Sequence, residues 1–150
     1  MNMALFSSFD ISATGMTAQR LRTDIISQNI ANVNTTRTED GTAYKRKTVV
    51  FAEKKTLADS FEKELRKATS LYSGSGVKVT NIVEDTTTPM NMVYDPSHPD
   101  ANEDGYVEYP NVNIITEMTN LIDATRSYEA NITAFNASKS MASKGLNVGK

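Results

Sequence analysis

The sequence predicts a mainly α-helical protein with a small β-rich middle, whose long N- and C-terminal helices pair as a coiled-coil-like bundle in an elongated subunit. A sustained heptad pattern near the C-terminus, a weaker pattern of the same period near the N-terminus, and a charge-rich middle with short alternating segments support this prediction. We therefore divide the chain into an N-terminal assembly helix (1–36), a middle region (37–112) and a C-terminal assembly helix (113–150).

The C-terminal pattern runs through residues 113–146 at alternating steps of four and three, with no glycine before Gly145. Such spacing keeps one helical stripe against a partner helix. The positions are Ile114, Met118, Leu121, Thr125, Tyr128, Ile132, Phe135, Lys139, Ala142 and Leu146. A second, shorter stripe lies beside them and consists of Ile115, Ile122, Ala130, Ala134 and Met141. The apolar face is therefore wider than one partner requires, and we expect more than one neighbouring helix.

A core helix in a compact bundle has the same period, so periodicity leaves two interpretations open. The distribution of charged residues along the chain distinguishes the two interpretations. Residues 1–36 contain four charged side chains and residues 113–150 contain seven, so most of the 16 basic and 18 acidic residues lie between them. An exposed helix normally has a charged outer face. The Ala, Ser, Thr, Asn and Gln around these segments instead indicate surfaces built for contact.

The N-terminal helix is expected to begin near Ser7, because Ser7 and Asp10 form an S-x-x-D capping pattern. Its weaker seam includes Leu21 and Ile25. Gly15 costs about 1 kcal/mol of helix stability relative to alanine, so the segment needs its partners, and we expect poorly ordered ends in isolated subunits. The asparagine-rich run from Asn29 should end the helix, since asparagine tolerates the left-handed conformation.

Composition excludes several classes of protein. The formal charge of −2 argues against nucleic acid as the main partner. No cysteine is available for disulfides or thiolate metal sites. The sequence has no run of 18 apolar residues and no basic segment before Arg20, so we expect neither a membrane span nor a cleavable signal peptide.

In the middle region, residues 48–51 and 77–83 are the strand candidates, and we expect them to pair. The loops around Tyr94 and Tyr106 should lie across this β unit. Between the strands, residues 53–75 form a variable, charge-rich segment, for which an amphipathic helix and a solvated loop are both open interpretations.

No motif supports catalysis, a metal centre or a cofactor. Residues 100–105 match the D-x-N-x-D-G opening of a calcium loop, but the twelfth position is Asn111 instead of glutamate and prolines flank the segment. A tight Asx-type turn before a strand explains the segment better. The only histidine, His98, has no second histidine or cysteine with which to build a zinc site or a triad.

Four sequence stretches, of which the first is residues 27–35, resemble a known family. The others lie at residues 40–47, 93–107 and 110–131, and the most distinctive members of the set are Asn29, Ile30, Ala31, Asn32, Thr35, Tyr94, Asp95, Pro96, His98, Pro99, Asp100, Gly105, Tyr106, Pro110, Asn111 and Val112. The first stretch resembles the N-terminal signature of flagellar rod, hook and related axial proteins. Together, the stretches resemble the proximal rod proteins of the bacterial flagellar basal body, and they cover nearly all of the chain except residues 53–75.

The resemblance implies a structural subunit of the rod, with no enzymatic activity, no cofactor and no contact with nucleic acid. Its partners would be copies of itself, other rod subunits and the flagellar type III export apparatus, and it would lie in the basal body across the periplasm. Helical assembly would transmit torque for motility. The alternative is a soluble helical adaptor or export chaperone of the flagellar system. We expect the assembly interface to include Leu21, Ile25, Ile114, Met118, Leu121, Tyr128, Ile132, Phe135 and Leu146.

Overall fold

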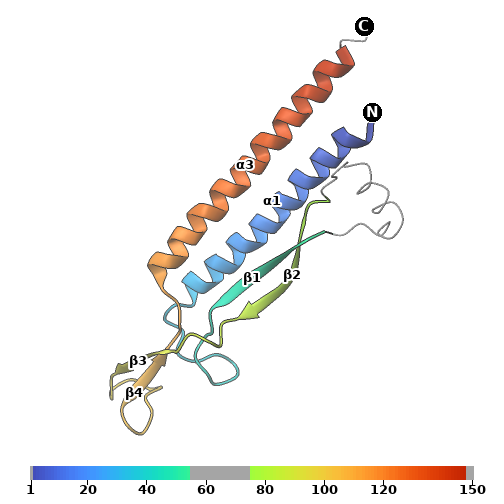
Figure 1. The fold of residues 1–150 in the computed structure, drawn as a ribbon. Coiled ribbons are helices and arrows are strands. Elements are labelled where there is room, and N and C mark those ends of the chain that lie inside the picture. Colours follow the sequence, from blue (N-terminus) through green and yellow to red (C-terminus); the bar gives the residue numbers. More distant parts are fainter. Residues whose placement is uncertain (1, 55–74, 148–150) are drawn as a thin grey trace, which may run out of the picture. The chain divides into compact units, whose positions relative to one another are not determined.

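A computed structural model describes residues 2–54 and 75–147 (Figure 1). The described elements are α1 (Asn2–Ala31), β1 (Lys47–Glu53), β2 (Val77–Glu84), β3 (Asn91–Tyr94), β4 (Tyr106–Tyr109) and α3 (Ile114–Asn147). Two long helices thus flank a small β-rich middle, which confirms the predicted mainly α class. Most of the variable segment, residues 55–74, lies outside the described residues.

The chain forms two compact units that each combine parts of both helices. Unit 1 draws on residues 1–20, 51–80 and 125–150, and unit 2 draws on residues 21–50 and 81–124. Unit 1 therefore gathers three segments and unit 2 gathers two, and these segments are far apart in the sequence. The contacts below are described within each unit.

Helix α1 begins before the predicted capping pattern. It starts at Asn2, so Ser7 and Asp10 lie inside the helix and the predicted start near Ser7 is wrong. The preceding Met, Ala and Leu residues are strong helix formers, which allows the helix to begin earlier. The predicted end is confirmed: the helix stops at Ala31, and Asn32 donates from its backbone and its side-chain amide to the Gln28 carbonyl at 3.0 and 2.8 Å.

Helix α3 begins directly after Asn113, as the sequence predicts. The Asn113 side-chain oxygen accepts from the backbone amides of Ile115 and Thr116 at 3.0 and 3.2 Å. This N-cap satisfies amides that have no partner within the helix. The helix then continues to Asn147.

The predicted strand pairing is also confirmed, because β1 and β2 form a two-stranded sheet (Figure 1). Hydrogen bonds extend the pairing at both ends: Lys54 donates to the Gly76 carbonyl at 2.9 Å, and Asp85 donates to the Arg46 carbonyl at 2.7 Å. At one end, Gly76 has a φ of 89°, and the Thr14 hydroxyl accepts from the Val77 amide at 3.2 Å. Residues with side chains rarely adopt this φ, which explains the glycine.

Tyr94 and Tyr106 do not lie in loops across this sheet, as the sequence analysis expected. They end β3 and begin β4, which pair antiparallel in a second sheet with Tyr94 opposite Tyr106 and Val93 opposite Val107. The two tyrosine rings pack edge to face with centroids 5.2 Å apart. Four-residue strands are too short for a convincing alternating pattern, and this cross-strand ring pair supplies stabilisation that periodicity does not reveal.

Within unit 1, α1 and α3 meet through a serine pair, an aromatic pair and a close approach at a glycine. The Ser8 and Ser138 hydroxyls are hydrogen-bonded at 2.7 Å, and the Phe9 and Phe135 rings meet edge to face with centroids 5.0 Å apart. A Cβ added to Gly15 would lie 2.6 Å from the Asn131 side-chain oxygen. Glycine therefore lets the two helices approach closely, and the cost of Gly15 in helix propensity has a packing reason.

Candidate assembly site

Asn29 is the centre of a buried polar cluster in unit 2 that also contains Tyr44, Arg46 and Glu117. Its side chain is fully buried. The Asn29 amide group donates to the Lys47 carbonyl at 2.8 Å and to the Glu117 carboxylate at 2.9 Å. Its oxygen accepts from the Tyr44 hydroxyl at 3.0 Å and the Lys47 amide at 2.9 Å. All four hydrogen-bonding positions are used, so Asn29 joins the end of α1 to β1 and to α3.

Glu117 is the charged member of the cluster and is only 1% exposed. Arg46 donates to one carboxylate oxygen from Nε at 2.9 Å and from Nη2 at 2.7 Å, while Asn29 donates to the other oxygen. An isolated buried carboxylate is strongly unfavourable unless it is paired and hydrogen-bonded. Arg46 and Asn29 meet both requirements, so the first turn of α3 depends on residues from two other segments.

Tyr44 lies against the same carboxylate. Burial raises the pKa of the Tyr44 hydroxyl, and the negative charges of Glu84 and Glu117 raise it further. Each of these influences disfavours the phenolate. The hydroxyl therefore remains a donor to Asn29 over a wider range of pH than a free tyrosine would.

Asn111 makes a second bridge in unit 2 and is buried. Its oxygen accepts from the Arg46 backbone amide at 2.9 Å, and its amide group donates to the carbonyls of Asp85 and Thr88 at 2.9 and 3.1 Å. The neighbouring Pro110 and Val112 are also buried. This short segment thus fixes the chain just before α3 begins.

The segment around His98 docks against the residues that follow α1. The Asp100 carboxylate accepts from the Thr36 hydroxyl at 2.8 Å and forms an ion pair with Arg37 at 3.6 Å. His98 Nδ1 accepts from the Asp100 backbone amide at 3.1 Å. Ser97 donates from its amide and hydroxyl to Asp95, and these bonds lower the pKa of the Asp95 carboxyl. His98 and Asp95 therefore shape a turn.

The segment with the calcium-loop pattern also forms a turn, as predicted. The Asn102 side-chain oxygen accepts from the backbone amides of Asp104 and Tyr106 at 3.1 and 2.8 Å, and β4 follows at once. Gly105 has a φ of 78°. In residues 2–54 and 75–147, no cluster of three or more histidine or acidic side chains is placed to hold a metal ion. None of the helices described there is suited to cross a bilayer.

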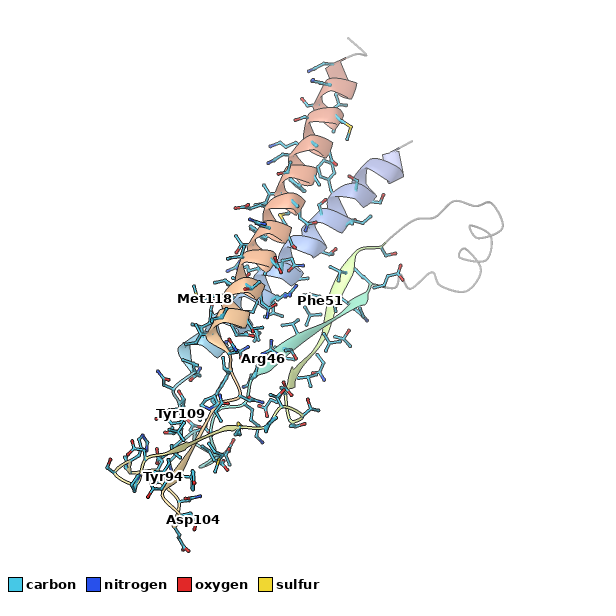
Figure 2. The ribbon with its side chains drawn as sticks, turned by 60° about the vertical axis from the view of Figure 1, so that its left-hand side comes forward. Arg46, Phe51, Tyr94, Asp104, Tyr109 and Met118 are labelled. Carbon is cyan, nitrogen blue, oxygen red and sulfur yellow. The ribbon has the colours of Figure 1, made fainter. Side chains whose placement is uncertain are left out.

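The first turns of α3 expose an apolar stripe, defined here as Ile114, Ile115, Met118 and Ile122. Ile115 is 77% exposed, Met118 is 54% exposed and Ile122 is 53% exposed. Figure 2 marks Met118 on this part of α3 and Arg46 near the start of β1. Single exposed apolar residues are ordinary, but a contiguous apolar patch usually marks a contact surface.

Three buried positions on the inward face of α3 each lie one residue before a position of the predicted seam. Glu117 and Ala124 are buried in unit 2, where the heptad pattern placed Met118 and Thr125. In unit 1, Ser138 is buried where the pattern placed Lys139. These inward positions are therefore polar or small, and the seam positions Met118, Thr125 and Lys139 are exposed and remain a predicted contact surface. The physical reason is that hydrogen bonds and close approach, more than apolar area, determine the inward face.

The residues predicted as an assembly interface consequently fall into three environments. Ile25 is buried within unit 2. Leu21, Leu121, Tyr128, Ile132 and Phe135 are half-buried, and Phe135 contacts Phe9 of the same chain. The exposed members are Ile114, Met118 and Leu146.

All of the signature residues lie in unit 2, where most of them hold the subunit together. Asn29, Asn111, Asp95, Asp100 and His98 form the bonds described above, and Thr35 donates to the Asn32 side chain at 3.2 Å. Of the others, Val112 and Pro110 are buried, Ile30 and Gly105 are half-buried, and the exposed members are Ala31, Pro96, Pro99, Tyr94 and Tyr106.

Sequence reasoning missed Arg46, Tyr44 and Glu117 as members of the site. One signal was present: Glu117 is an acidic residue spaced three positions after Ile114 and four before Leu121, within an otherwise apolar stripe. A charge at such a position indicates a buried partner. The position of that partner, Arg46, 71 residues away, was not readable from helical spacing.

β3 provides a second exposed apolar surface in unit 2. Met92, Val93 and Tyr94 are 51%, 46% and 65% exposed. Val93 and Tyr94 are paired with β4, but every position of β3 remains open to solvent on at least part of its side chain. Figure 2 marks Tyr94 in this hairpin together with Tyr109 of β4.

Comparisons with known proteins match both ends of the chain and its full length. Residues 9–37 match the family described as flagella basal body rod protein, and residues 103–148 match flagellar basal body rod FlgEFG protein C-terminal. A flagellar basal-body rod protein FlgC of Bacillus subtilis is 46% identical, with 99% of this chain and 100% of that protein covered. The chain belongs to the FlgC family of flagellar basal-body rod proteins.

Other FlgC proteins support the same assignment. The FlgC of Borreliella burgdorferi is 44% identical over 96% of this chain and 97% of its own length. The FlgC of Escherichia coli O6:H1 is 37% identical over 99% of this chain and 100% of its own length. In this FlgC chain, the hydrogen bond between Asn29 and Glu117 connects the two separately matched regions.

Proposed function

We propose that this FlgC chain is a structural subunit of the flagellar basal-body rod, which contacts neighbouring subunits through the apolar stripe of α3. Membership of the rod-protein family supports the structural role. The exposure of Ile115, Met118 and Ile122 beside a satisfied polar interior carries the choice of surface. A subunit that turned its apolar side chains inward would have less surface to offer a neighbour.

Helical assembly needs two different surfaces on each subunit. A heterologous interface joins one patch to a non-identical patch on the next copy, and it generates a filament when the rotation does not close. The α3 stripe and the exposed side of β3 provide two distinct apolar surfaces within unit 2. Many such contacts would share the torque that the rod transmits, with no need for a catalytic centre or a cofactor.

We further propose that the subunit reaches the periplasm through the flagellar type III export apparatus. Such export requires an unfolded chain. The small and polar contacts of unit 1, such as Ser8 with Ser138, suit this requirement because they expose little apolar area when they separate. The Phe9–Phe135 ring pair is the larger apolar contact that must open.

The test replaces the chromosomal gene with Ile115→Glu and Met118→Glu variants and asks whether each subunit appears in purified basal bodies. Both positions are exposed, so we expect wild-type helicity, normal export and loss of incorporation and swimming. Thr116→Glu is the matched control, since Thr116 is exposed on the same turns but lies about 100° around the helix from Ile115. Normal incorporation of both stripe variants would refute this contact surface.

The same preparation separates a rod subunit from an adaptor or export chaperone. A rod subunit remains in purified basal bodies after the membrane and the cytoplasmic export components have been removed. An adaptor or chaperone is absent from such preparations, while export of other rod proteins fails without it. Absence of the wild-type chain from purified rods would therefore contradict the structural role.

A further inference from the structure

The exposed stripe of α3 poses a physical question within unit 2. Apolar burial is worth about 25 cal/mol for each Å² removed from water, yet Ile115, Met118 and Ile122 remain largely exposed. Met118 faces outward, whereas Leu121 on the same part of the helix is half-buried. Successive residues lie about 100° apart around an α-helix, so a turn of roughly one position would bury more of the stripe.

The polar cluster opposes such a turn. With the helix rotated, the Glu117 carboxylate would leave its bonds to Arg46 and Asn29, at 2.7 to 2.9 Å. Asn29 is fully buried and its amide group would lose one of its two acceptors. Buried polar groups that lose a partner are strongly disfavoured. The helix therefore keeps Glu117 inside, and its apolar neighbours along the chain face outward.

Other contacts in unit 2 do not select the same rotation as strongly. Ala124 is fully buried and permits close approach, but its small side chain has little apolar area to lose. Asn113 caps the backbone amides of Ile115 and Thr116, a bond set that any rotation of the side-chain faces could retain locally. The carboxylate of Glu117 is thus the feature that distinguishes the observed rotation from its apolar alternative.

We propose that Glu117 is a positioning residue whose carboxylate, held by Arg46 and Asn29, sets the rotation of the first turns of α3 and thereby presents Ile115, Met118 and Ile122 outward. Buried ionic and polar groups have this kind of role in setting helix register elsewhere, often without adding net stability. The consequence for assembly rests on the proposed function of the stripe. The rotation itself is a property of the isolated subunit.

Single-cysteine labelling can measure the rotation directly, because the natural chain has no cysteine. Met118→Cys and Ile122→Cys report on the outward face, and Ala124→Cys reports on the inward face. In the full-length chain with Glu117 unchanged, we expect a maleimide to label the Met118→Cys and Ile122→Cys variants rapidly and the Ala124→Cys variant slowly. Circular dichroism at the same concentration monitors the fold.

The deciding change is Glu117→Met, which replaces the carboxylate by an apolar side chain of similar length. We expect the order of labelling to reverse, so that the introduced thiol becomes protected in Met118→Cys and accessible in Ala124→Cys. Asp123→Asn is the matched control, since it removes an exposed carboxylate from the same helix and should leave the order unchanged. A folded Glu117→Met variant with the wild-type order of labelling would overturn the proposal.

A second variant decides the matter if Glu117→Met does not fold. Replacing both partners, with Glu117→Met and Arg46→Met in one chain, leaves neither charge buried without its partner. A folded double variant with the reversed labelling order supports the positioning role, and a folded double variant with the wild-type order contradicts it. Correct labelling combined with normal rod incorporation of Ile115→Glu would instead count against the proposed contact surface alone.

Discussion

The two units of the chain pair the same two helices by different physical means. In unit 2, the polar cluster connects α1 to α3, and Ile25 and Ile26 of α1 are buried. In unit 1, α1 and α3 meet through a serine pair, one aromatic pair and a close approach at Gly15, and Ser12 and Ala18 of α1 are buried. We infer that unit 2 fixes the conformation of the isolated subunit, while unit 1 depends more on its neighbours.

The sequence predicts poorly ordered ends in the isolated subunit, including residues 21–30, but the buried side chains of unit 2 restrict that expectation to residues 7–20 and 125–147. Amide exchange should be slow in residues 21–30, where Asn29 and Ile25 are buried, and fast in residues 7–20 and 125–147. Assembly into the rod should then protect the unit 1 segments. Equal protection of both parts of α1 in a dilute sample would remove the difference between the units.

The largest loss of stability is expected from Arg46→Ala. This change leaves the Glu117 carboxylate buried without its ionic partner, and breaking a buried pair in this way typically costs about 3–5 kcal/mol. Urea unfolding of the isolated subunit measures the loss. Arg126→Ala is the control, because Arg126 is exposed and its removal should change the free energy of unfolding by less than about 0.5 kcal/mol.

Asn29 and Asn32, two asparagines of the N-terminal signature, should contribute different amounts to the free energy of unfolding, although the sequence presents them as equivalent. Asn29→Ala leaves the Tyr44 hydroxyl and the Lys47 amide without an acceptor, and such unsatisfied buried groups cost about 1–3 kcal/mol each. We expect a loss of about 3 kcal/mol in urea unfolding. Asn32→Ala removes partly exposed bonds and should cost less than about 1 kcal/mol. Similar losses would mean that the cluster does not distinguish them.

In unit 1, Phe135→Ala should cost about 1–2 kcal/mol, since the half-buried ring loses its edge contact with Phe9. Amide exchange should accelerate mainly in residues 125–147. A double-mutant cycle with Phe9→Leu should give a coupling free energy of about 1 kcal/mol between the two rings. If the acceleration reached residues 21–30 equally, the two units would be one cooperative element.

The smallest effect concerns alkaline pH. The pKa of Tyr44 is raised in the folded chain, so the folded state retains the proton that the unfolded state loses near pH 10. Stability should therefore fall as pH rises above about 10. Tyr44→Phe should flatten that slope in urea titrations, and Tyr94→Phe, at an exposed ring, should leave it unchanged. An unaltered slope in Tyr44→Phe would refute this assignment.

The sequence predicted the long helices because their patterns extend over many turns and their ends carry local signals, such as Asn113 and the run after Asn29. It also predicted the β1–β2 pairing, whose segments alternate well. The heptad pattern did not identify Glu117 and Ser138 as buried positions, because periodicity counts apolar residues. Both residues are held by partners distant in the sequence.

The candidate site shows the same division. Resemblance drew attention to Asn29 and Asn111, but their hydrogen-bond partners come from other segments, and no local spacing specifies them. The rings of Tyr94 and Tyr106 were visible as residues, whereas their pairing depends on the register of two very short strands. Long-range polar contacts were therefore the part that could not be read from the sequence.

The central claim is that the apolar stripe faces other subunits while the polar cluster holds the subunit itself together. Ile115→Cys, Met118→Cys and Ile122→Cys variants that still swim, labelled both as isolated subunits and in purified basal bodies, test it most directly. We predict rapid labelling of all three in the isolated subunit and strong protection in the rod. Equally rapid labelling in both states would contradict the account.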